Sequence, residues 1–327
     1  MRLGIFTGLF MLAEKDFEET LDFLSELGLQ AIELCPRSGS RFLDLDELLG
    51  NDSALRRVRD SMARHGLAIS ALACHGNPVH PRKEAADESH QLFVKMVRLA
   101  ERMDVNSVIG FSGCPGDAPG AKHPNWVACP WPDEFLEVLN YQWDEVLIPY
   151  WVRAAELARS HGVTRICIEP HPGFSVYNPE TLLKLRAAVG DSIGANFDPS
   201  HFFWQGIDSS VAIRDLGTAI YHCHIKDTRV DRQNVAKNGV IDTKHYSDVK
   251  NRAWLFRTVG YGHDLSVWKE ILMSLKTIGY DGVLSIEHED GFMSLQEGVR
   301  KAVEFMKQAF IFEEPDGVSE RIYPTRD

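Results

Sequence analysis

Short apolar runs and amphipathic segments alternate along almost the whole chain, and this alternation limits the folds it can adopt. The apolar runs predict strands at 3–7, 31–35, 68–74, 107–111, 165–169, 193–197, 220–225 and 282–287. Segments with helical periodicity follow them at 16–28, 52–66, 82–103, 143–162, 179–190, 207–218, 265–279 and 294–310. Alternating strands and helices form a parallel sheet, and eight such units close a barrel. The sequence therefore predicts an α/β fold, a (β/α)8 barrel formed by a single domain over residues 1–327.

Two connections are much longer than the others. They cover residues 112–140, after the fourth predicted strand, and 226–262, after the seventh. Both follow strand C-termini, which is the face of a barrel that carries active sites, and long loops there are usually lids or binding loops. Trp126, Trp131 and Trp254 in these loops could stack on a sugar ring, or they could pin the loops to the barrel.

Composition and charge exclude several classes of protein. The net charge of -12 disfavours nonspecific binding to nucleic acid or to an anionic membrane. No apolar run is long enough to span a bilayer, and the apolar N-terminus fits a first strand and its loop better than a signal peptide. The six cysteines form no CxxC pair, which suits free thiols in a reducing compartment. We therefore expect a cytoplasmic protein.

An ionisable side chain stands where each of four predicted strands ends. The segments ICIEPHP, IGANFDPSH, IYHCHIKD and LSIEHED carry Glu169, Asp198, His224 and Glu287. Buried ionisable groups are costly unless they are paired or bind a metal. Three carboxylates and one imidazole suit manganese, magnesium or cobalt better than a thiolate-rich zinc site does. The pattern predicts one divalent-cation site, although each residue could instead form a structural salt bridge, and His222 could compete with His224.

These segments, with ALACHGNPVHP after the third strand and GYDGVLSIEHED at the eighth, resemble the xylose isomerase-like TIM barrel family of sugar phosphate isomerases and epimerases. The resemblance covers essentially the whole chain. It implies that Glu169, Asp198, His224 and Glu287 bind a divalent metal, Mn2+ in the first place, with Mg2+, Co2+ or Zn2+ as alternatives. It also implies proton abstraction next to a carbonyl through a metal-stabilised enediolate, in which Glu169 and Glu287 act as acid and base.

Several further side chains are candidates for the same site. By the resemblance, His201 and Arg229 match positions that contact substrate oxygens. His171, two residues beyond Glu169, departs from the pattern of simple epimerases, and His75 could face the same cavity. Each of these histidines would supply a group with a near-neutral pKa, or would be a structural loop residue. The predicted catalytic residues are thus Glu169, Glu287 and His171, and the predicted substrate-binding residues are His75, His201, Arg229 and Trp131.

Four functions compete. The first is a metal-dependent isomerase or epimerase of a ketose, a keto-inositol or a related polyol. The alternative is a metal-dependent lyase that cleaves 3-oxo-glycosides, as C-glycoside-cleaving relatives do with a small partner subunit; His171 and the long loops favour it modestly. An apurinic endonuclease is disfavoured, because that activity requires more histidines, including one where strand four ends in Gly110-Phe111. A non-catalytic sugar-binding barrel would lack some of the four ligands.

The expected partner is a small sugar or keto-sugar, with neither nucleic acid nor membrane as a ligand. The expected assembly is a homo-oligomer, or a hetero-oligomer with a small subunit if the protein is a lyase.

Overall fold

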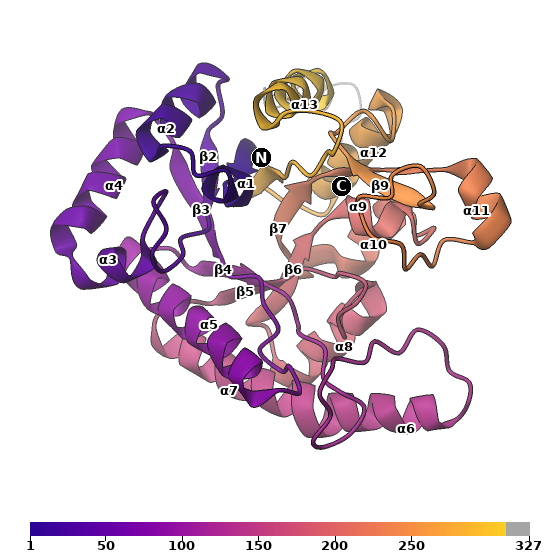
Figure 1. Cartoon of the computed structure of the whole chain (residues 1–327). Helices are drawn as coiled ribbons and strands as arrows, with labels where there is room; N and C mark the ends of the chain where they lie inside the picture. Colours follow the sequence, from indigo (N-terminus) through magenta and orange to yellow (C-terminus); the bar gives the residue numbers. More distant parts are fainter. Residues whose placement is uncertain (312–327) are drawn as a thin grey trace, which may run out of the picture.

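Eight parallel strands form a closed barrel in a computed structural model that describes residues 1–311 (Figure 1). The strands are β1 (Arg2–Phe6), β2 (Ala31–Leu34), β3 (Ala68–Ala73), β4 (Ser107–Gly110), β5 (Arg165–Ile168), β6 (Ile193–Phe197), β7 (Ile220–Ile225) and β10 (Val283–Ile286). They are hydrogen-bonded in sequence order around the barrel, and β10 closes it against β1. The predicted (β/α)8 architecture is confirmed, while residues 312–327 of the predicted domain lie outside the described residues.

Helices surround the barrel, as Figure 1 shows. The longer ones are α2 (Phe17–Glu26), α4 (Asp52–Arg64), α5 (Lys83–Met103), α7 (Ile148–Ser160), α8 (Pro179–Val189), α10 (Ser209–Leu216), α12 (Leu265–Thr277) and α13 (Leu295–Ala309). Most begin at a side-chain cap; Asn178, for example, accepts a hydrogen bond from the Thr181 amide at the start of α8. None of the helices within residues 1–311 is long and apolar enough to cross a membrane.

Several strands alternate between an apolar outer face and an inner face with polar side chains. On β7, Cys223 and Ile225 belong to the apolar core, whereas His222 contacts Asn196 on β6 and His224 contacts Glu33 on β2. Successive side chains of a strand point to opposite faces, so His222 and His224 share one face. Glu33 on β2 and Ser285 on β10 reach the same interior, where a carboxylate oxygen of Glu33 contacts His224 and Ser285. The interior of this barrel therefore combines a hydrogen-bonded polar group with a small apolar cluster that includes Ala71, Ile109 and Cys167.

The two long connections contain more structure than the sequence predicted. After β4, the chain enters α6 (Glu134–Asn140), which continues through the π-helical turn Tyr141–Leu147 into α7. After β7, the strands β8 (Asp227–Val230) and β9 (Trp254–Arg257) form a two-stranded antiparallel sheet, and the helix α11 (Arg232–Asn238) lies between them in sequence. Trp254 is buried and stacks on Trp204 with ring centroids 4.5 Å apart, so it anchors this excursion by packing.

Candidate metal centre

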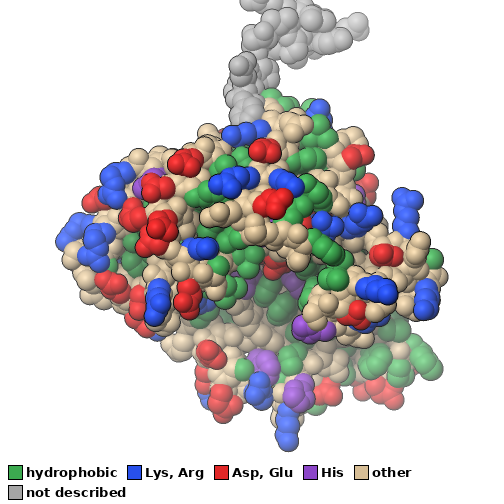
Figure 2. Space-filling model, turned by 45° about the horizontal axis from the view of Figure 1, so that its top comes forward, with side chains coloured by type: hydrophobic (Ala, Val, Ile, Leu, Met, Phe, Trp, Pro, Cys, Tyr) green, Lys and Arg blue, Asp and Glu red, His purple; other side chains and the backbone are tan. Residues whose placement is uncertain are grey.

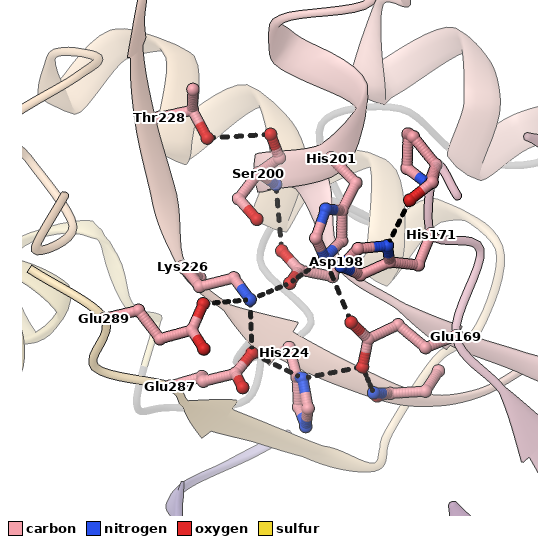
Figure 3. Close-up of polar contacts among 12 residues, drawn as sticks. Glu169, His171, Asp198, Ser200, His201, His224, Lys226, Thr228, Glu287 and Glu289 are labelled. Atoms are coloured by element: carbon pink, nitrogen blue, oxygen red, sulfur yellow. Dashed lines mark hydrogen bonds and ion pairs between the residues drawn. The ribbon is translucent and has the colours of Figure 1, made fainter. Parts of the chain in front are cut away.

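Four buried side chains converge at the C-terminal end of the barrel. Glu169 follows β5, Asp198 follows β6 and caps the short helix α9 (Pro199–Phe203), His224 lies on β7, and Glu287 follows β10. One potential ligand atom from each lies within 4.8 Å of the others. Figure 3 shows these side chains pointing toward one another. The structure thus brings together all four residues that the sequence predicted as metal ligands.

Two of the four groups have a buried atom that makes no hydrogen bond among residues 1–311, although Lys226 Nζ lies 3.1 Å from one of them, Asp198 Oδ2. These atoms are Asp198 Oδ2 and His224 Nδ1. His224 Nδ1 lies 3.3 Å from Glu169 Oε2 and 3.1 Å from Glu287 Oε2. Unsatisfied polar atoms are rare in buried positions and call for an explanation such as a bound ion. The donor set of carboxylate oxygens and one imidazole nitrogen fits a divalent cation.

Glu33 fixes the orientation of His224 from inside the barrel. The Nε2 atom of His224 lies 2.9 Å from Glu33 Oε2, and Ser285 Oγ donates to the same oxygen at 2.9 Å. A histidine that donates one ring nitrogen to a carboxylate presents the other nitrogen as a ligand. Glu33 was not among the predicted site residues, although a single acidic residue inside the apolar run 31–35 was a signal for it.

His222 does not compete with His224 for the centre. Its Nδ1 lies 3.0 Å from Asn196 Oδ1 and its Nε2 lies 3.3 Å from Ser70 Oγ, both inside the barrel. Burial lowers the pKa of His222 to about 4. A second group of side chains close enough to hold a metal ion consists of Glu33, His222 and His224. His224 belongs to both groups.

Lys226 is a second residue that the sequence analysis missed, although it lies within the HIKD segment. Its buried ammonium lies 2.7 Å from Glu287 Oε2, 3.1 Å from Asp198 Oδ2 and 3.1 Å from Glu289 Oε2. Burial alone would lower the pKa of Lys226, but these carboxylates hold it well above its ordinary value. Three ligand carboxylates and one ammonium sum to a formal charge of -2, which one divalent cation would neutralise.

Both predicted catalytic carboxylates have a lowered pKa, which favours their ionised form. Burial would raise the pKa of Glu169, but hydrogen bonds with His201 and His75 hold it well below the usual range. Burial would likewise raise the pKa of Glu287, but the charges of Lys226 and His224 keep it far below its usual value. Two buried carboxylates at one site are therefore available as proton acceptors near neutral pH.

Three of the predicted histidines lie at this site. His201 is buried, with Nε2 3.0 Å from Glu169 Oε1, and His75 Nε2 lies 3.3 Å from Glu169 Oε2. The ring of His171 lies 4.0 Å from that of His201, and its Nδ1 donates to the Pro172 carbonyl at 2.6 Å. Burial and the neighbouring His201 lower the pKa of His171 to about 3, so our expectation of a near-neutral pKa was wrong for this residue.

Arg229 and Trp131 are both exposed at the surface, and a substrate-binding role for either stays a prediction. Thr228 points inward on β8, where its hydroxyl donates to the Ser200 carbonyl at 2.8 Å. Strand alternation therefore directs Arg229 the other way, and it is exposed and lines a separate cavity. Trp131 is 76% exposed, whereas Trp126 takes the partly buried position in the same loop, against Tyr177.

Comparison with known proteins identifies the family. Residues 21–309 match the family described as Xylose isomerase-like TIM barrel. The chain belongs to this family. It is 40% identical over 296 residues to the Uncharacterized protein YfiH of Bacillus subtilis (strain 168), an alignment that covers 89% of this chain and 94% of YfiH.

Solved structures share the fold at low sequence identity. The probable 3-DHS dehydratase AsbF from Bacillus anthracis superposes with a TM-score of 0.66 and 17% identity, over 94% of this chain and 99% of that one. The IOLI protein with a binding zinc atom gives a TM-score of 0.64 at 18% identity, over 94% and 98% of the two chains. A D-tagatose 3-epimerase-like protein gives 0.63 at 19% identity, over 98% and 100%. At such identities these likenesses establish the barrel only.

Proposed function

We propose that this protein is a divalent-metal-dependent isomerase or epimerase of a keto-sugar. The observation that carries the proposal is the pair of buried, ionised carboxylates, Glu169 and Glu287, whose oxygens lie 3.3 Å and 3.1 Å from the same nitrogen of His224. Two bases at one site suit the removal and return of a proton next to a carbonyl. Similarity to a family of this name and to a D-tagatose 3-epimerase-like structure supports the proposal.

The metal would be held by Glu169, Asp198, His224 and Glu287. When bound, a divalent ion would polarise the substrate carbonyl and lower the pKa of the adjacent C–H bond. Manganese is the ion that we propose first, because hard oxygen donors dominate the set. The zinc atom in the similar IOLI structure supports a bound metal without deciding which metal this chain takes.

The protein's own groups position the two bases. Glu169 Oε2 accepts a hydrogen bond from Asn196 Nδ2 at 3.0 Å, and its other oxygen lies 3.0 Å from His201 Nε2. Glu287 Oε2 accepts from Lys226 Nζ at 2.7 Å. Each carboxylate is thus fixed from a different side, Glu169 by β6 and α9 and Glu287 by the end of β7. In the proposed reaction one of them takes the proton from carbon, and a proton returns from either one.

A lyase acting on 3-oxo-glycosides is the second candidate. An apolar cavity of about 550 Å³ adjoins the centre and has room for an aglycone. His171 lines this cavity, but its imidazole is neutral, so it could accept a proton but is poorly suited to deliver one to a leaving group. The small partner subunit, the homo-oligomer and the cytoplasmic location remain predictions.

The test is solvent exchange on keto-sugars. Manganese-loaded protein in D2O should incorporate deuterium next to the carbonyl of at least one ketose and interconvert two sugars. Glu287→Gln should lower the exchange rate by about 10²–10⁴-fold, because it removes a base and retains the shape of the side chain. Glu297→Gln is the matched control and should leave the exchange rate unchanged, since Glu297 pairs with Lys301 on α13 and contacts none of the proposed ligands. Full exchange in excess chelator, with loss of metal confirmed, would eliminate the proposal.

A further inference from the structure

A cavity with aromatic walls opens directly above the metal centre. Its volume is about 550 Å³, and its walls include Phe111, Phe174, Tyr246, Leu255, Phe256 and Phe292. These residues come from the segments that follow β4, β5 and β10 and from the excursion that contains β8 and β9. Figure 2 shows hydrophobic and histidine side chains gathered around a hollow in this region of the surface. Four separate parts of the chain thus contribute to one apolar enclosure.

The floor of this cavity is shared with the metal centre. The Lys226 ammonium lies 4.7 Å from the centre of the Phe256 ring, and that ring lies edge-on to His201 at 5.4 Å. Glu289, which lines the cavity, is 3.1 Å from Lys226 Nζ. A keto-sugar whose carbonyl lies next to the four proposed metal-binding residues would therefore place its adjacent substituent in this cavity.

The walls are suited to a flat apolar group. Phe111 and Phe174 stack with ring centroids 4.3 Å apart, and Tyr246 lies nearly parallel to Phe256 at an interplanar angle of 18°. At the mouth, Phe292 is 60% exposed. Large apolar side chains held open to solvent around a cavity indicate a binding surface more than a packed core.

The same walls offer few partners to hydroxyl groups. Among the described lining residues, only His171, Tyr246 and Glu289 carry polar side-chain atoms. A second sugar unit would lose water from several hydroxyls here and regain few hydrogen bonds, which is unfavourable. An aromatic ring would lose little and would gain stacking and apolar burial.

We infer that this cavity is a subsite for an aromatic substituent attached to the keto-sugar. The inference rests on the proposed function for the placement of the sugar, and it narrows the substrate class. The preferred substrates are sugars that carry an aryl group as a glycoside, and free ketoses fill only the part of the site next to the metal ligands. It holds for both the isomerase and the lyase, because it concerns binding of the substituent and not its release.

Binding of simple glycosides tests this inference without turnover. Phenyl β-D-glucopyranoside and methyl β-D-glucopyranoside present the same sugar with and without the ring, and calorimetry on the manganese-loaded full chain compares them. The phenyl glycoside should bind about 10-fold or more tightly, in line with the discrimination that apolar pockets achieve. Phe292→Ser should reduce this preference to below about 3-fold without changing the affinity for the methyl glycoside.

Controls separate the subsite from the rest of the proposal. Val211→Ser, which replaces a side chain that is 64% exposed on α10, should retain the full preference. A phenyl glycoside that binds no tighter than the methyl glycoside, including the case in which neither binds, overturns the subsite. A preference that survives both Phe292→Ser and Phe174→Ala also overturns it, because the ring then binds elsewhere. Titration of the same samples with manganese tests the metal centre independently. Failure of the proposed function would appear as a loss of manganese binding, and not in the ratio of the affinities for the phenyl and methyl glycosides.

Discussion

Replacing Glu33 by Gln should weaken metal binding although Glu33 is not itself one of the four proposed ligands. Glu33 is fully buried, and its Oε2 atom lies 2.9 Å from His224 Nε2 and accepts from Ser285 Oγ at 2.9 Å. Gln retains the size of the side chain and removes the negative charge next to the imidazole. Carboxylates in this position raise the basicity of the ligand nitrogen, and their loss typically lowers metal affinity by about 10–100-fold. This change corresponds to about 1.4–2.8 kcal/mol of binding free energy.

Competition with a fluorescent chelator would measure the dissociation constant for Mn2+ at fixed neutral pH. A second readout is the rise of the melting temperature on adding Mn2+, which depends on the ratio of free metal to the dissociation constant. Glu33→Gln should show a smaller rise than wild type at the same metal concentration. If Glu33 had a purely structural role, Glu33→Gln would lower the melting temperature of the metal-free protein and leave the metal-induced rise unchanged.

Ser70→Ala provides the matched control. Ser70 contacts His222 at 3.3 Å within the same interior but touches none of the four ligands. It should leave the affinity for Mn2+ unchanged within about 2-fold, as is usual for positions that do not contact the affected group. A Glu33→Gln protein with wild-type affinity, or an equal loss in Ser70→Ala, would refute the reasoning that Glu33 acts through His224.

Three further substitutions test other parts of the site. Lys226→Met should destabilise the metal-free protein by about 3–5 kcal/mol in urea unfolding, because Asp198 and Glu287 would lose their buried counter-charge; an unchanged midpoint would contradict this. His171→Ala should lower deuterium exchange by less than about 10-fold if the protein is an epimerase, whereas a loss of about 10²-fold in aglycone release from a 3-oxo-glycoside would favour the lyase. Trp131→Ala should change the free energy of unfolding by less than about 0.5 kcal/mol, as exposed positions usually do, and should leave KM unchanged; a raised KM would restore its predicted role.

The barrel and the convergence of the four candidate ligands could be predicted because both depend on short-range patterns. Four of the strands are apolar runs with an ionisable residue at their C-terminal end, and the C-terminal ends of parallel strands meet at one face. Glu169, Asp198 and Glu287 each follow a strand directly, so their approximate positions follow from the strand boundaries alone.

Arg229 shows where such patterns fail. The four residues of β8 show no alternation strong enough to identify a strand, so the direction of its side chains could not be assigned. Its spacing from His224 suggested a site residue, but the antiparallel pairing of β8 with β9 places Thr228 inward and Arg229 outward. A position two or more residues beyond a strand depends on tertiary pairing that local sequence does not encode.

Glu33 and Lys226 were missed for a different reason. Both are charged residues whose roles depend on partners far away in sequence, at separations of 191 residues for Glu33–His224 and 61 for Lys226–Glu287. A single charge in or after an apolar run signals that it must be compensated. It does not identify the partner, which only the closed barrel brings into contact.

The most direct test of the metal centre is anomalous diffraction at the manganese edge from crystals soaked in Mn2+. We predict one strong peak with Glu169, Asp198, His224 and Glu287 each contributing an atom at about 2.0–2.4 Å, the range for divalent cations with oxygen and nitrogen ligands. A peak between Glu33 and His222, or no peak within reach of the four residues at saturating Mn2+, would contradict the account.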